Sequence, residues 1–207
     1  HLVLALVLAA VAAGAGFFLA RHTAAPPGAT IEGLLWPNPR TLTPFNVIDQ
    51  DGKPFSIDNL SGQWSLLFFG FTHCPDICPL TLSVLARAEP GLVAAARGTP
   101  LQVIFVSVDP ERDAPAQLAE YVRYFDPGFL GLGGTLDQVR TLTSQLGVAF
   151  FHGTATPQGD YTVDHSAAVF VIDPKARFVG VLSAPHQVEP MTARFQAIAE
   201  FIQRAGR

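Results

Sequence analysis

Residues 64–79 of this 207-residue chain read WSLLFFGFTHCPDICP, and this stretch decides the fold. Residues 64–70 are an apolar run of strand length, which is typical of a strand buried on both faces of a sheet. Both cysteines of the chain lie in the loop that follows. Because Pro79 suits the first turn of a helix, we predict a helix over residues 79–97, kinked or ended by Pro90.

Outside this stretch, strand-like and helix-like patterns alternate. The pair Asp51-Gly52 between two apolar segments is a hairpin signal, and Thr135 and Gly147 suit the two ends of a helix. We expect strands or extended segments at 45–49, 53–57, 101–108, 148–152, 167–173 and 178–182, and helices at 114–125, 135–146 and 187–204. This order predicts an α/β fold in which helices cover a central mixed sheet.

The N-terminal segment predicts a membrane-crossing step. Residues 2–20 carry no charge, and as a helix they would span roughly 28 Å, close to the ~30 Å hydrocarbon core of a bilayer. We interpret residues 1–20 as a transmembrane anchor, or alternatively as a signal segment cleaved near residues 23–25. Residues 21–43 then form a Pro-rich linker, and residues 44–207 form a domain on the periplasmic or equivalent extracytoplasmic side.

The composition excludes several classes of function. The formal net charge is −4 and the chain has no run of basic residues, so a nucleic-acid-binding surface is not expected. Two cysteines four positions apart do not make a disulfide-rich secreted scaffold. They indicate metal binding or redox chemistry instead.

The two cysteines, Cys74 and Cys78, stand where a loop enters a helix. Pro75 disfavours the helical conformation at Cys74, and Pro79 places Cys78 near the helix N-terminus, where free N–H groups lower a thiol pKa. We therefore expect both sulfurs to be partly exposed and easily deprotonated. Residues four apart on a helix hold their Cβ atoms about 5–6 Å apart, whereas a disulfide needs about 3.8 Å. The spacing favours an ion between the sulfurs, although it does not exclude oxidation.

Two sulfur ligands select Cu(I) or zinc, and a third ligand should be an imidazole or a thioether. Met191 and six histidines are candidates. His165 is favoured because it stands between a polar loop and the strand at 167–173, with Asp164 beside it. Asp76, Asp109 and Asp164 are candidate hydrogen-bond acceptors that orient His165 or organise the loop, with solvated or turn-capping carboxylates as the alternative.

Three segments in order resemble the Sco/SenC family of copper chaperones, and the resemblance covers roughly residues 40–205. These segments are GFTHCPDICP at 70–79, VDPERD at 108–113 and VDHS at 163–166, with Ser166 where Thr is common. The resemblance implies a thioredoxin-like fold that holds copper, as Cu(I) or Cu(II), through Cys74, Cys78 and His165. It also implies a redox-active Cys74–Cys78 disulfide, an N-terminal membrane tether, and three kinds of partner: a copper donor, a thiol reductant and the copper-bearing subunit of cytochrome c oxidase.

Two functions fit this resemblance. The first, which we favour, is a metallochaperone that delivers copper to the binuclear site of cytochrome c oxidase without turnover. The second is a membrane-anchored thiol–disulfide reductase that maintains the cysteines of that site, and it does not need His165. Thioredoxin-type reductases carry C-x-x-C and a cis-proline where this chain has Asp164-His165-Ser166, and peroxiredoxins carry Thr where it has Phe71. A structural disulfide in a peptide-binding domain is the remaining alternative.

Overall fold

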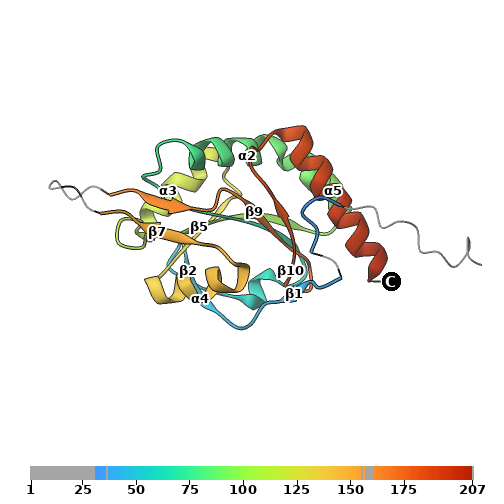
Figure 1. The fold of residues 1–207 in the computed structure, drawn as a ribbon, viewed down its shortest axis with the longest axis horizontal. Coiled ribbons are helices and arrows are strands. Elements are labelled where there is room, and N and C mark those ends of the chain that lie inside the picture. The colour runs from blue at the N-terminus through green and yellow to red at the C-terminus, as the bar shows by residue number, and fades with distance from the viewer. Residues whose placement is uncertain (1–30, 36, 155, 157–160, 207) are drawn as a thin grey trace, which may run out of the picture. The chain divides into compact units, whose positions relative to one another are not determined.

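The computed structural model describes residues 31–35, 37–154, 156 and 161–206. The anchor or signal segment predicted at 1–20 and the first part of the predicted linker lie outside these residues. An eight-stranded mixed sheet forms the centre of the domain, in the order β1-β10-β9-β4-β5-β6-β2-β3 (Figure 1). Its strands are β1 (Arg40–Thr41), β2 (Asn46–Asp49), β3 (Pro54–Ser56), β4 (Trp64–Gly70), β5 (Leu101–Ser107), β6 (Leu130–Gly133), β9 (Val169–Ile172) and β10 (Arg177–Leu182).

Helices cover both faces of this sheet, which confirms the predicted α/β architecture. They are α2 (Ile77–Ala95), α3 (Pro115–Phe125), α4 (Leu136–Leu146) and α5 (Val188–Ala205), with a short 3-10 helix, η1 (Ile57–Leu60). Figure 1 shows α2, α3 and α5 on one side of the sheet and α4 on the other. A separate two-stranded ribbon pairs β7 (Phe150–His152) with β8 (Val163–His165).

The predicted central strand β4 is buried along its whole length, and its side chains alternate between the two faces. Leu67 and Phe69 join the cluster that packs beneath α4, while Trp64 meets Phe195 of α5 edge to face, with ring centroids 5.4 Å apart. Burial of each such large apolar side chain contributes about 1.5–3 kcal/mol. These layers hold the end of β4 rigidly in place.

The strand directions gather three loops at one edge of the sheet. β4 and β5 run parallel, with Gly70 opposite Ser107, and β9 runs antiparallel on the other side of β4. The carboxyl ends of β4 and β5 therefore lie beside the beginning of β9. This edge brings together the cysteine loop, the loop after β5 and the segment between β8 and β9.

Of the two predicted effects of Pro90, a kink or an end of the helix, the end does not occur in α2. The helix continues to Ala95, and Ala88, Leu92 and Ala95 stay buried on either side of the proline. A proline removes one helical hydrogen bond, but the packing of α2 on α5 keeps the last turn in place. α2 is also, within the described residues, the one helix long and apolar enough to cross a membrane by length and composition, a test that core helices of soluble domains pass as well.

Three strands were not predicted from the sequence: β1, β6 and β8, of which β8 lies where a polar loop was expected. β6 reads LGLG, so it lacks an apolar run, and its glycines let α3 approach: a Cβ at Gly131 would lie 3.1 Å from Cβ of Leu118. β1 lies inside the segment predicted as linker, where Arg40 pairs with Phe178 of β10 and Leu42 is buried. Part of that segment, from Glu32 onward, thus belongs to the compact domain.

Candidate metal centre

The edge of the sheet brings Cys74, Cys78 and His165 into one cluster. Cys74 lies in the loop after β4, Cys78 is the second residue of α2, and His165 ends β8. Their sulfur and nitrogen atoms all lie within 4.8 Å of one another, and Sγ of Cys78 is 3.3 Å from Nε2 of His165. Cys74 and Cys78 are far from His165 in the sequence, yet the three side chains lie close enough together to bind one ion.

The two thiols have opposite electrostatic environments. A hydrogen bond from the Cys78 thiol, with further hydrogen bonds from His165 and from the backbone at Asp76 and Cys78, lowers the pKa of Cys74 to about 3. The same hydrogen bond, burial and the neighbouring Cys74 charge raise the pKa of Cys78 far above its ordinary value. The shared hydrogen bond therefore favours a state in which the buried Cys78 carries the proton and Cys74 is the thiolate.

The expectation that both sulfurs are partly exposed is correct for Cys74 and wrong for Cys78, which is fully buried. The helix N-terminus favours a thiolate, but Cys78 is buried against Gly70. A Cβ at Gly70 would collide with Sγ of Cys78. Gly70 is thus a residue of the site that the sequence pattern did not reveal, since a glycine at the end of a strand is unremarkable there.

The imidazole of His165 is fixed by its neighbours. Its Nδ1–H donates to the carbonyl of Ser166 at 3.1 Å, and Nε2 faces the sulfurs. Its ring meets the rings of Phe68 and Phe71 edge to face, with centroids 6.1 and 5.9 Å away. The imidazole is thereby oriented so that Nε2 can act as a metal ligand.

The carboxylates predicted to orient His165 do not do so, because the Ser166 carbonyl occupies that position. Asp76 and Asp164 are exposed. Asp109 is fully buried, but it accepts hydrogen bonds from Nε of Arg112 at 2.5 Å and from the hydroxyl of Tyr161 at 2.6 Å.

Asp109 instead joins the loop after β5 to the segment that precedes β8. The guanidinium of Arg112 lies 3.7 Å from the ring centroid of Tyr161 and 5.5 Å from that of Phe71, which also contacts the His165 ring. Burial and the bond to Asp109 raise the pKa of Tyr161 to about 12. The buried carboxylate therefore supports the position of His165 through packing and not through a direct bond.

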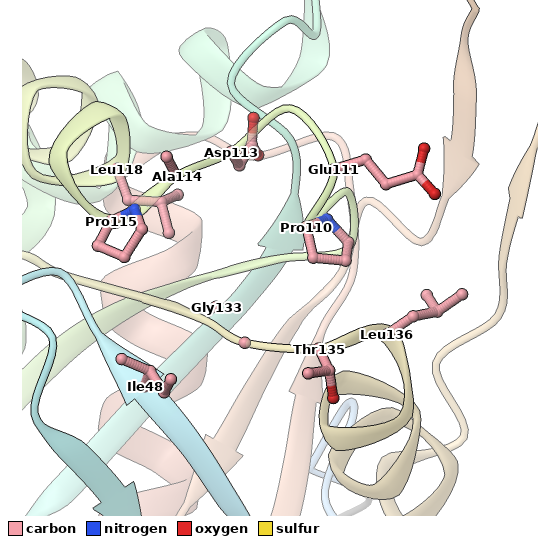
Figure 2. A pocket seen from close by; sticks show the side chains of 11 residues that line it. Ile48, Pro110, Glu111, Asp113, Ala114, Pro115, Leu118, Gly133, Thr135 and Leu136 are labelled. Carbon is pink, nitrogen blue, oxygen red and sulfur yellow. The ribbon is translucent and has the colours of Figure 1, made fainter.

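A cavity of about 490 Å³ lies on the loop that follows β5 (Figure 2). Its wall is mostly apolar and includes none of the three clustered ligands. The lining residues are Ile48, Pro110, Glu111, Asp113, Ala114, Pro115, Leu118, Gly133, Gly134, Thr135 and Leu136. The metal-ligand cluster is therefore a separate feature from this cavity.

Comparisons with known proteins agree with this geometry. The SCO1/SenC family model matches residues 36–200. A protein of Stutzerimonas stutzeri is 41% identical over 156 residues, covering 75% of this chain and 76% of the relative. The mitochondrial SCO1 homolog 1 of Arabidopsis thaliana is 39% identical over 149 residues, which are 72% of this chain and 44% of that protein, so this chain spans about half the length of such mitochondrial relatives.

Solved structures show the same fold with copper present. Arabidopsis thaliana ScoI with copper bound superposes with a TM-score of 0.69 at 36% identity, covering 78% of this chain and 98% of that one. Bradyrhizobium japonicum ScoI with copper bound gives a TM-score of 0.67 at 34% identity, covering 76% and 99%. The predicted thioredoxin-like fold is thereby confirmed, and the chain belongs to the SCO1/SenC family.

Proposed function

We propose that this chain is a copper metallochaperone that supports assembly of the binuclear copper site of cytochrome c oxidase. The observation that carries the proposal is the compact group of two sulfurs and one imidazole nitrogen. Soft thiolates with an imidazole suit copper, and family members with copper bound share the fold. Cys74, Cys78 and His165 are the proposed ligands, and copper is the cargo.

The asymmetry of the two thiols defines how copper would enter. Cys74 is a partly exposed thiolate, so it is the first ligand that an incoming ion meets. Cys78 holds the proton of the pair, and that proton must leave when copper binds, because the thiolate is the metal ligand. His165 is held by its bond to the Ser166 carbonyl, with Nε2 3.3 Å from Sγ of Cys78, so it would close the site as the third ligand.

The same asymmetry weakens the alternative of a thiol–disulfide reductase. A strongly lowered thiol pKa stabilises the reduced pair, and such a pair gives up electrons reluctantly. A disulfide between Cys74 and Cys78 would instead be readily reduced by a partner. A pair that is easily reduced suits a copper-binding site that a thiol reductant keeps in its reduced, copper-binding form.

The His165→Ala variant separates the two functions. The reduced protein should bind one copper per chain, and the variant should lose Cu(II) affinity more than Cu(I) affinity, because two thiolates still hold Cu(I) in nearly linear coordination. Its thiol–disulfide exchange with glutathione should continue. If copper binding is undiminished in the Cys74→Ser/Cys78→Ser double variant, the proposed ligands are wrong.

We also propose that residues 1–20 anchor the chain to a membrane, with the copper-binding domain on the periplasmic or equivalent side. The proposed partners there are a copper donor, a thiol reductant and the copper-bearing oxidase subunit. Membrane fractionation, with protease added to intact spheroplasts, tests both statements. A domain that resists protease until the membrane is opened would contradict the proposed side.

A further inference from the structure

Asp113 ties the cysteine loop to two other elements through one buried carboxylate. Its side chain is fully buried, and Oδ1 accepts the hydroxyl of Thr72 at 2.6 Å. Oδ2 accepts the backbone N–H of Thr72 at 3.0 Å and the hydroxyl of Ser107 at 2.6 Å. Nε2 of Gln117, in α3, donates to the Thr72 hydroxyl at 3.0 Å. We call this set of four side chains the Asp113 clamp.

The clamp acts on the loop that carries Cys74. Thr72 is two residues before Cys74, and the N–H of Cys74 donates to the carbonyl of Phe71 at 3.1 Å. Hydrogen bonds to a buried carboxylate are charge-assisted and short, so they restrict Thr72 strongly. The start of the loop is thus fixed to the ends of β5 and α3, while its other end enters α2.

We propose that Asp113 is a positioning residue for the metal centre. Through Thr72, it holds Cys74 at the spacing from Cys78 and His165 that an ion needs, and it opposes the closer approach of the sulfurs that a disulfide requires. The ligand atoms already lie within 4.8 Å without a metal, so metal uptake requires little further ordering of the loop. This inference rests on the proposed copper binding by the three ligands.

The clamp should therefore influence two measurable equilibria. Loss of the clamp should weaken Cu(I) binding, because the loop must then be ordered on uptake. It should also favour the disulfide, whose formation joins the two sulfurs and passes two electrons to oxidised glutathione, while the proton of Cys78 and one proton from solvent complete the two glutathione thiols. A residue with only a structural role would lower stability and leave both equilibria unchanged.

The chain offers a matched control at the opposite end of the sheet. Asp173 follows β9 and is also buried, and it accepts hydrogen bonds from Arg177 and from the backbone N–H of Lys175. Asp173→Asn and Asp113→Asn each replace one acceptor oxygen of a buried carboxylate with an N–H₂ group. Both should lower stability, but only Asp113→Asn should alter the metal centre.

The experiment compares the full chain with Asp113→Asn, Thr72→Val, Thr72→Ser and Asp173→Asn. Cu(I) affinity is measured by competition with bicinchoninate, the disulfide equilibrium in glutathione buffers, and the site geometry from the thiolate-to-Cu(II) charge-transfer spectrum. We expect Asp113→Asn and Thr72→Val to weaken Cu(I) binding about tenfold, to shift the disulfide equilibrium about tenfold toward oxidation and to change the spectrum, since each loses a buried hydrogen bond. Thr72→Ser and Asp173→Asn should match the wild type in Cu(I) affinity, in the disulfide equilibrium and in the spectrum.

Unchanged equilibria and spectrum in Thr72→Val would overturn the inference, even if Asp113→Asn fails to fold. Equal shifts in Asp173→Asn would also overturn it, because they would reflect general destabilisation. If the wild-type protein binds no copper, the proposed function fails separately, and the glutathione equilibrium still decides whether the clamp controls the loop.

Discussion

Gly70→Ala should damage the metal centre without touching a ligand. The added Cβ would overlap Sγ of Cys78 and would lie 2.9 Å from Cε2 of Phe105. Sγ must therefore move by roughly 1 Å to regain an ordinary van der Waals separation. Metal–ligand distances tolerate only about 0.2 Å, so a shift of this size removes Cys78 from a productive position.

The expected magnitude follows from the cost of overpacking a buried site, about 1–3 kcal/mol. If this cost falls on the bound state, Cu(I) affinity should drop by about 5- to 150-fold. The assay is Cu(I) competition with bicinchoninate, together with thermal unfolding of the metal-free protein.

Gly91→Ala is the matched control, because its Cβ would lie 2.9 Å from Cγ2 of Thr192, on the face of α2 toward α5. It also overpacks a contact of α2, so stability should fall while copper affinity should not change. Wild-type copper affinity in Gly70→Ala would refute the conclusion that Cys78 is held tightly against β4.

Three further predictions concern the thiols and the domain boundary. Between about pH 3 and 8.5 the unfolded pair binds one proton more than the folded pair, so the free energy of unfolding of the reduced protein should rise with pH. Above that range the free energy of unfolding should fall, because Cys78 then keeps its proton only in the folded state. Urea titrations at several pH values measure this free energy, and Cys74→Ser should remove its rise with pH. Oxidation removes both sulfur ligands, so the disulfide form should bind copper at least about a hundredfold more weakly, and equal affinity in the two redox states would contradict the ligand set. Removal of residues 1–31 should leave the melting temperature of the domain unchanged, whereas removal of residues 1–43 should lower it, because β1 and Leu42 are lost from the sheet and core.

The sequence predicted those parts of the fold that have strong local signals. The apolar runs of β4 and β5, the Asp51-Gly52 hairpin and the capped helix α4 lie where we expected them. β6 was missed because its two glycines serve a contact with α3, which no local pattern encodes. β1 was missed because a two-residue strand is specified by its partner β10 and not by its own composition.

For the candidate site, the sequence supplied the three residues that cluster but not their electrostatics. Residue type and spacing identified Cys74 and Cys78, whereas the burial of Cys78 depends on the space left by Gly70 at the end of β4. Asp113 was visible only as part of a motif, since its partners Thr72 and Ser107 come from two other elements. Contacts of this kind are set by tertiary packing, so a single sequence does not reveal them.

The placement of the one proton links the fold to copper transfer. In the proposed copper transfer, the buried Cys78 carries the proton of the pair and the partly exposed Cys74 is the thiolate, so copper would enter and leave on the side of Cys74. A partner that presents its own thiolate would meet the metal at Cys74 first, and it could then displace Cys78, which regains its proton as the metal departs. The return of that proton favours release, because it restores the stable hydrogen-bonded thiol pair. This proton return is what the proposed metallochaperone role requires, because it would oppose retention of the metal after a partner thiolate binds it.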